Sequence, residues 1–310
     1  MNLGAYIFPG QGSQAVGMGR DLYEHSRGAR EVYERASEAV KLDLAALSFE
    51  GPEEELRKTV NTQPALLTAS AAAFAALTER GIEPGAVAGH SLGEWTALVA
   101  ARSIRLEEAV RAVRERGRLM YEAGLATPGT MAAVVGLTEE EIGPVVAEAR
   151  AKGVVQVANL NAPTQIVVSG EVQAVRLAME LAAAREGVRV TELKVSGAFH
   201  SELLDGARRG MEPVAAAVRV ERPHAVFVAN VTGAPVDDPE EIRRGLVRQI
   251  VSPVRWADSV RTLVDAGVPY FVEVGPGNVL RGLLRKIEPG ARSFGVATIE
   301  DVDKLASAVA

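Results

Sequence analysis

Short apolar runs alternate with segments of helical periodicity along this chain. Residues 5–8 form an apolar run that ends in a glycine-rich turn, and residues 86–89 form a second run. Between them, apolar side chains recur at i, i+3 and i+4 over residues 30–40, and an alanine-rich helix is expected to open at Thr62-Gln63-Pro64 and continue through Leu77. Strand–turn–helix alternation with short connections predicts a parallel sheet flanked by helices.

The middle of the chain shows a different order of elements. Four strands are expected at 131–136, 154–160, 165–169 and 188–195, with helices at 139–151 and 172–184. This β-α-β-β-α-β order is the ferredoxin-like pattern. It is bounded by the turn signals Thr127-Pro128-Gly129 and Ser196-Gly197. The sequence therefore predicts a large α/β domain in two parts, 1–126 and 198–310, with a small ferredoxin-like subdomain inserted at 127–197.

The amino-acid composition excludes several kinds of functional site. The chain has 310 residues, of which 47% are hydrophobic, enough for a sizeable core. It has no cysteine and four histidines, which excludes disulfides, thiolate nucleophiles and cysteine-based metal sites, and no metal centre is expected. A net charge of −6 argues against a nucleic-acid partner. No signal peptide or membrane-spanning run is apparent, so a cytoplasmic protein without membrane contact is expected.

The sharpest chemical signal is Gly89-His90-Ser91-Leu92-Gly93, which matches the G-x-S-x-G nucleophile elbow. It lies between an expected strand at 86–89 and an expected helix at 92–101, as that motif requires. Glycines on both sides permit the sharp turn that lifts the Ser91 hydroxyl clear of the sheet. The Leu92 N–H, at the start of the helix, would then face an oxyanion. A glycine-flanked surface turn is the alternative, but the flanking strand and helix favour catalysis.

A serine nucleophile needs a base, and His200 is the candidate because it lies where the chain leaves the inserted subdomain. The side chain of His90 is expected to point away from the reaction path of the serine. His25 is expected at the exposed end of a helix, and His224 follows a proline in a loop.

The third member of a catalytic triad is missing from the expected interval. No aspartate occurs between Ser91 and His200. Glu94 and Glu115 do occur there, in helical patterns that suggest solvated faces. Either a glutamate is recruited, or a backbone carbonyl orients the histidine, since the Nδ1 proton needs only an acceptor.

Several short motifs point to a known family when taken together. They are Phe8-Pro9-Gly10-Gln11-Gly12-Ser13-Gln14, Thr62-Gln63-Pro64-Ala65-Leu66, Gly89-His90-Ser91-Leu92-Gly93-Glu94, Arg116-Gly117, Asn161-Ala162-Pro163, Phe199-His200-Ser201, Val247-Arg248-Gln249 and Glu273-Val274-Gly275-Pro276-Gly277. In their order and spacing the chain closely resembles, over nearly its whole length, the malonyl-CoA:acyl carrier protein transacylases. It looks like the free-standing bacterial form that serves type II fatty acid biosynthesis.

The resemblance implies an α/β-hydrolase-like large domain, a ferredoxin-like small one, and an active site in the cleft between them. It makes Ser91 the nucleophile and His200 its base. The main-chain carbonyl of Gln249 would orient His200, which would account for the missing aspartate. Backbone N–H groups of Gln11 and Leu92 would form the oxyanion hole.

The resemblance also assigns residues to the acyl group. Arg116 would hold the malonyl carboxylate by a two-pronged ion pair, for which a guanidinium is better suited than lysine. Gln63 and Asn161 are expected to line the same pocket. Phe199 resembles malonyl-selective members, in which a bulky ring leaves little room for an α-methyl branch.

The mechanism implied is ping-pong transfer from malonyl-CoA to the phosphopantetheine thiol of holo acyl carrier protein, through a malonyl-serine ester. No metal or redox cofactor is implied, and a monomer is expected. A serine thioesterase or esterase acting on a carboxylated acyl thioester is one alternative, since it would share the elbow and the histidine. A catalytically idle carrier-binding scaffold is another, but intact Ser91 and His200 count against it.

A basic face for the acidic carrier protein is a further expectation. Arg281, Arg285 and Lys286 are candidates on the helix expected after residues 275–277. An ordinary solvated helix face is the simpler interpretation, particularly because 34 basic residues include only six lysines and arginine is abundant throughout.

Overall fold

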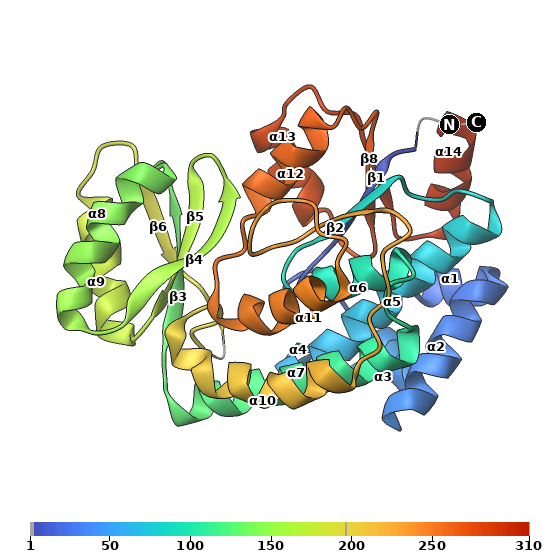
Figure 1. Cartoon of the computed structure of the whole chain (residues 1–310), viewed down its shortest axis with the longest axis horizontal. Coiled ribbons are helices and arrows are strands. Elements are labelled where there is room, and N and C mark those ends of the chain that lie inside the picture. The colour runs from blue at the N-terminus through green and yellow to red at the C-terminus, as the bar shows by residue number, and fades with distance from the viewer. Residues whose placement is uncertain (1–2, 196, 310) are drawn as a thin grey trace.

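The computed structural model describes residues 3–195 and 197–309, which fold into a large domain and a small subdomain (Figure 1). Ser196 of the expected turn Ser196-Gly197 lies outside the described residues. Within these ranges, no helix is both long enough and apolar enough to cross a membrane.

The large domain is built on a five-stranded sheet in the order β7-β2-β1-β8-β9. All four neighbouring pairs are parallel, which confirms the predicted parallel sheet. Its strands are β1 (Ala5–Phe8), β2 (Ala86–Gly89), β7 (Val226–Val228), β8 (Phe271–Val274) and β9 (Ser293–Val296). The apolar runs at 225–231 and 270–274 predict two strands that return to this sheet, and β7 is shorter than the first of them. No such run predicted β9.

Helices cover both faces of this sheet, because successive strand side chains point to opposite sides. Tyr6 and Phe8 of β1 belong to the main core beneath the N-terminal helices, whereas Ala5 and Ile7 pack with α12 and α13 on the other face. The helices of the large domain are α1 (Arg20–His25), α2 (Arg27–Val40), α3 (Leu44–Glu50), α4 (Glu53–Arg57), α5 (Thr59–Glu79), α6 (Gly93–Ala100), α7 (Leu106–Ala126), α10 (Asp205–Ala217), α11 (Pro239–Arg248), α12 (Trp256–Asp265), α13 (Val279–Ile287) and α14 (Ile299–Val309), with 3₁₀ turns η2 (Glu202–Leu204) and η3 (Gln249–Val251).

Helix α5 begins earlier than predicted. Proline favours the first turn of a helix, but α5 starts at Thr59 and carries Pro64 inside it. The added turn is fixed by packing, since Thr59, Thr62 and Gln63 are all buried. It lies against α7, where a Cβ on Gly117 would come within 2.7 Å of the Thr59 carbonyl oxygen. Glycine at 117 therefore lets the two helices approach closely.

The small subdomain consists of a four-stranded antiparallel sheet with two helices. Its strand order is β4-β5-β3-β6, and its element order is β-α-β-β-α-β, as predicted for a ferredoxin-like unit. The elements are β3 (Thr130–Val135), α8 (Glu139–Ala149), η1 (Arg150–Lys152), β4 (Val155–Ala162), β5 (Gln165–Gly170), α9 (Val172–Ala183) and β6 (Arg189–Glu192). It has its own core, and the mixed α/β fold class is confirmed.

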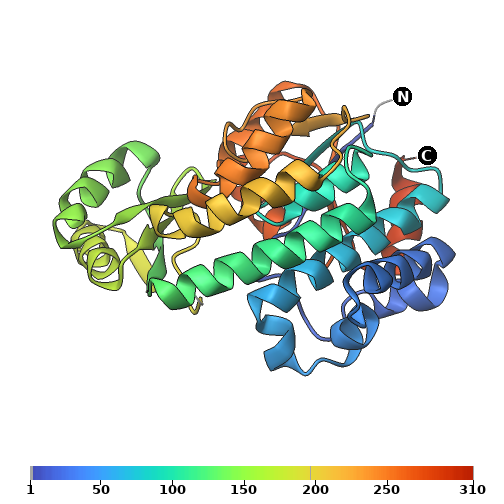
Figure 2. The same ribbon diagram turned by 60° about the horizontal axis from the view of Figure 1, so that its bottom comes forward.

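Long helix α7 leads from one body to the other. Figure 2 shows it in green, reaching from the helical side of the large domain to the small subdomain, where the chain continues into β3.

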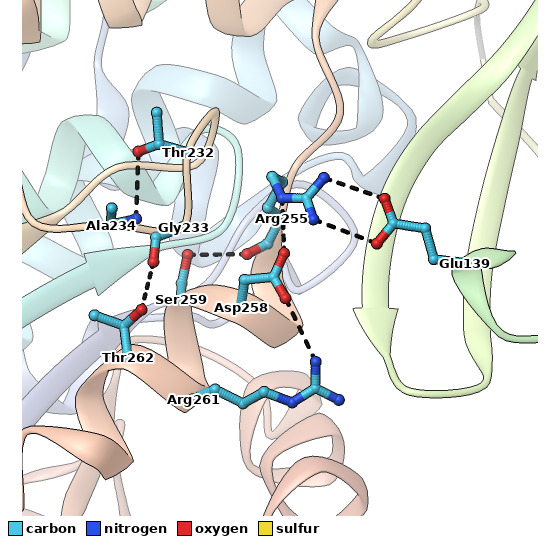
Figure 3. A network of polar contacts seen from close by, with 9 residues as sticks. All are labelled: Glu139, Thr232, Gly233, Ala234, Arg255, Asp258, Ser259, Arg261 and Thr262. Carbon is cyan, nitrogen blue, oxygen red and sulfur yellow. Dashed lines mark hydrogen bonds and ion pairs between the residues drawn. The ribbon is translucent and has the colours of Figure 1, made fainter.

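Strand β4 joins the two bodies by backbone and side-chain contacts. Val254 N donates to Ala158 O at 2.9 Å and Leu160 N donates to Val254 O at 2.9 Å, so the edge of the small sheet pairs with the large domain. The next residue, Arg255, reaches Glu139 at the start of α8 with two contacts of 3.2 and 3.3 Å (Figure 3). Backbone hydrogen bonds and an ion pair thus hold the small subdomain against the large domain.

Candidate active site

The turn after β2 has the geometry of a nucleophile elbow, and its two glycines are sterically required. A Cβ on Gly89 would lie 1.9 Å from the backbone of Gly93, and a Cβ on Gly93 would lie 2.1 Å from the carbonyl oxygen of Phe8. Ser91 between them has φ +52°, in the left-handed region that side chains other than glycine rarely adopt. The predicted sharp strand-to-helix turn, with a glycine required on each side, is confirmed.

Asn230 holds the strained serine in place. Its Oδ1 accepts a hydrogen bond from Ser91 N at 2.8 Å, and its Nδ2 donates to Gly89 O at 2.6 Å. Asn230 is fully buried and follows β7, the strand beside β2. No sequence motif predicted a role for it. A polar residue just beyond the carboxyl end of a strand in a parallel sheet was the signal that could have found it.

The Ser91 hydroxyl faces His200. Its Oγ lies 2.8 Å from His200 Nε2, and the other ring nitrogen, Nδ1, lies 2.9 Å from the carbonyl oxygen of Gln249. A carbonyl can only accept, so Nδ1 carries the hydrogen, and in the neutral ring Nε2 is free to accept the Ser91 proton. A backbone carbonyl therefore occupies the place that an aspartate holds in a triad.

The imidazole of His200 is held neutral. Only 4% of the residue is exposed. Burial, and next the positive charge of Arg116, lowers the pKa of His200 to about 3. At neutral pH the ring is consequently a proton acceptor toward Ser91 rather than a cation.

Arg116 brings a buried positive charge to the nucleophile. Its guanidinium donates to Ser91 Oγ at 3.2 Å and to the side-chain oxygens of Gln63 and Gln249 at 2.9 and 2.8 Å. Burial lowers the pKa of Arg116 to about 10, with the Glu94 carboxylate opposing the shift, so the group stays charged at neutral pH. Nη1 has one N–H beyond its bond to Gln63, and Nη2 frees another when it releases Ser91 Oγ, so the two terminal nitrogens can together bind a carboxylate.

A cavity of about 280 Å³ opens beside these residues, between the two bodies. Ser91, His200, Arg116 and Phe199 contribute to its wall from the large domain. Gln11 and Leu92 also line it, at the carboxyl ends of the adjacent strands β1 and β2. Their placement agrees with backbone N–H groups directed at the reaction centre, while their role in an oxyanion hole stays a prediction.

One predicted position differs from expectation. Gln63 is buried behind Arg116 and accepts its hydrogen bond, rather than forming part of the cavity wall. His90 contributes to that wall, but its ring contacts Asn161 and Trp256. Its Nε2 is 2.8 Å from Asn161 Oδ1, so these two residues join the elbow to β4 across the cleft. Asn161 lines the cavity as predicted.

Glu94 corrects the prediction of a solvated face. It is 2% exposed, because seven of the eight residues of α6 are buried and the helix has no solvent side. Its carboxylate accepts from Asn230 N at 2.7 Å and from Gln249 Nε2. Its place within the motif Gly89–Glu94 was the signal for a functional position. Glu115, in contrast, pairs with Arg118 near the surface as expected.

The proposed basic face is only partly available. Arg281 turns toward the buried Glu273, with 3.5 Å between Nε and Oε2. Arg285 is exposed, and Lys286 Nζ donates at 2.7 Å to Gln165 Oε1, which borders the cavity. A part for Arg285 and Lys286 in carrier binding stays a prediction.

Comparisons with known proteins agree with this geometry. The model of the acyl transferase domain family matches residues 5–303. The malonyl CoA-acyl carrier protein transacylase of Bacillus subtilis (strain 168) is 42% identical over 300 residues, covering 96% of this chain and 95% of that protein. The enzyme of the same name from Staphylococcus aureus (strain MRSA252) is 38% identical over 303 residues, covering 97% and 98%.

Solved structures show the same likeness. The malonyl-CoA:acyl carrier protein transacylase of Xanthomonas oryzae pv. oryzae superposes with a TM-score of 0.95 at 41% identity, covering 99% of this chain and 98% of that one. A malonyl-transacylase solved with the holo acyl carrier protein of a type II polyketide synthase superposes with a TM-score of 0.93 at 38% identity, covering 98% and 99%.

Proposed function

This chain belongs to the acyl transferase family and, within it, to the malonyl-CoA:acyl carrier protein transacylases, and we propose that it moves a malonyl group through an ester on Ser91. The donor is malonyl-CoA and the acceptor is the phosphopantetheine thiol of acyl carrier protein, which supplies fatty acid biosynthesis. One observation carries the proposal: Ser91 Oγ contacts both a neutral histidine and a buried arginine, the latter at 3.2 Å. The histidine supports acyl transfer by the serine, and the arginine supports binding of a carboxylate beside it.

The first half-reaction forms the ester. Ser91 Oγ gives its proton to His200 Nε2 and bonds to the thioester carbon, and the resulting oxyanion accepts hydrogen bonds from the Gln11 and Leu92 N–H groups. When the oxyanion collapses, the carbon–sulfur bond breaks and coenzyme A leaves with the proton from His200. Arg116 holds the malonyl carboxylate throughout.

The second half-reaction reverses these steps with a new thiol. The phosphopantetheine thiol gives its proton to His200 and its sulfur bonds to the ester carbon. Breaking the carbon–oxygen bond returns the proton to Ser91. These steps use only side chains and backbone groups of this chain and the two thiols, so we propose no further cofactor.

All of the proposed catalytic groups belong to one chain, which supports a monomer as the working unit. The cytoplasmic location and the lack of a nucleic-acid partner stay predictions from the sequence.

Incubation with malonyl-CoA and holo acyl carrier protein tests the function. We expect malonyl-carrier protein to form, with little free malonate, and mass spectrometry to detect one malonyl group on Ser91 before the carrier is added. The Ser91→Ala variant should show no adduct. Free malonate as the main product would identify a thioesterase instead, and an adduct on Ser91→Ala would refute the nucleophile.

A further inference from the structure

Two hydrogen-bond donors converge on the buried carboxylate of Glu94. Asn230 N donates to Oε1 at 2.7 Å, and Gln249 Nε2 donates to Oε2. Neither nitrogen can accept a hydrogen bond. An ionised carboxylate satisfies both donors, whereas a glutamine would direct its NH₂ group at one of them. A protonated acid would offer a weaker acceptor at its hydroxyl oxygen and would add a hydrogen that needs a partner of its own. The site is therefore built for a carboxylate at this position.

The carboxylate is one of three acceptors that set which way the Gln249 amide faces, and the only charged one. Gln249 Nε2 donates to Glu94, to the carbonyl oxygen of Ser91 at 2.9 Å and, more distantly, to Asn230 Oδ1 at 3.3 Å. The opposite end of the amide, Oε1, consequently faces Arg116 and accepts its hydrogen bond at 2.8 Å. If the amide turned over, its NH₂ group would face the guanidinium, and Arg116 would lose one of its two amide oxygens.

We propose that Glu94 is a positioning residue for malonyl recognition. Through the Gln249 amide it holds the Arg116 guanidinium in the place, next to Ser91 Oγ, from which it binds the malonyl carboxylate. Glu94 does not touch the acyl group and acts on it only through Gln249 and Arg116. This inference rests on the proposed function, and it adds a determinant of acyl specificity to that site.

Glu94 also borders a second cavity, whose lining residues are different from those of the cavity beside Ser91. This second cavity measures about 330 Å³, and its other charged wall residues are Glu241, Arg244 and Arg248 of α11. From α7, the charge of Arg116 favours the ionised form of Glu94. Burial outweighs these effects and raises the pKa of Glu94 to about 7. The ionised fraction of Glu94 therefore grows as pH rises through neutrality.

The test compares malonyl with acetyl transfer, since only the former has a carboxylate to place. For Glu94→Gln, we expect the ratio of kcat/KM for malonyl-CoA to that for acetyl-CoA to fall about tenfold or more. The reason is that the NH₂ group of the introduced amide would face one of the two buried donors, Asn230 N or Gln249 Nε2. The matched control Glu115→Gln, altered next to Arg116 but on the outer side of α7, should keep the ratio. In an Arg116→Ala background, Glu94→Gln should change the ratio by less than about twofold.

An unchanged ratio in folded Glu94→Gln, or a further fall in the Arg116→Ala background, would overturn the proposal. If Glu94→Gln does not fold, the wild-type ratio measured from pH 6 to pH 8 decides. A ratio that rises with pH through about 7 supports the proposal, and a flat or falling ratio overturns it, because effects on the attacking thiol are common to both acyl groups. Wild-type enzyme that forms no malonyl-Ser91 would instead refute the proposed function itself.

Discussion

At the scale of single residues, Gln249 contacts both the histidine and the arginine of the site. Its main-chain oxygen accepts from His200 and its side-chain oxygen accepts from Arg116, so one fully buried residue contacts both the proposed base and the proposed carboxylate anchor. Gln63 supports the same guanidinium from the opposite side. Arg116 thus has two fixed amide oxygens as partners, which leaves its charge available to a ligand.

Replacing Arg116 by alanine should separate malonyl from acetyl transfer. Truncating one partner of a buried charge pair costs about 2–5 kcal/mol, so kcat/KM for malonyl-CoA should fall by roughly 30-fold or more beyond any loss for acetyl-CoA. Arg116→Lys, which keeps the charge but loses the fork, should recover only part of the loss. Steady-state kinetics with both donors checks this, and equal losses would contradict the anchor role.

At the scale of elements, the active site lies where parallel strands end. The loops after β1 and β2 come together because these strands pair in register, Phe8 opposite Gly89. Close approach there depends on Gly10, since a Cβ on it would lie 2.4 Å from the His90 carbonyl oxygen. The elbow and the segment carrying Gln11 are consequently parts of one rigid sheet edge.

Gly89→Ala should destabilise the protein strongly. The added Cβ would overlap the backbone of Gly93, and overpacking of this kind costs about 1–3 kcal/mol or more. Gly143→Ala is the matched control, because Gly143 lies exposed in α8 with nothing within 4 Å of an added Cβ. That variant should gain about 0.5–1 kcal/mol from helix propensity. Urea unfolding of both variants measures the difference; similar free energies of unfolding would contradict the steric argument.

At the scale of the whole molecule, the small subdomain contributes residues to the cavity and contacts the backbone of His200. Strand β4 supplies Asn161 to the cavity, and Gln156 on the same strand donates to the main-chain oxygens of His200 and Val251, each at 3.1 Å. His200 is therefore held from both bodies. The ion pair between Arg255 and Glu139 in Figure 3 is more exposed, with half of the Glu139 side chain accessible to solvent.

Gln156→Ala should lower transfer of malonyl and acetyl groups alike, because it frees the backbone of His200 without touching Arg116. Unsatisfied buried carbonyls should also reduce the free energy of unfolding by about 1–3 kcal/mol. Glu139→Gln, which removes the exposed ion pair with Arg255, should lower the free energy of unfolding by less than about 1 kcal/mol and leave kcat/KM near wild type. Kinetics and urea unfolding test both variants. A larger loss for Glu139→Gln would mean that the surface ion pair joins the two bodies.

The sequence by itself predicted the strands other than β9, the insertion of the small subdomain, the elbow and His200 as the candidate base for its serine. Each of these predictions depends on a local signal: apolar periodicity, the glycines that a tight turn requires, or a short motif that can be recognised in the sequence alone. The absence of an aspartate between Ser91 and His200 left two possibilities for the group that orients the histidine, a glutamate or a backbone carbonyl, and only the family resemblance pointed to Gln249.

Only the tertiary structure decided what surrounds these groups. Helical periodicity describes one helix alone, whereas the burial of Glu94 depends on the neighbours that enclose α6 on all sides. Likewise, packing against α7 extended α5 ahead of Pro64 and placed Gln63 behind Arg116. Contacts between residues distant in sequence, such as Glu94 with Asn230 and Gln249, leave no local pattern, because burial and hydrogen bonding arise only when separate elements meet.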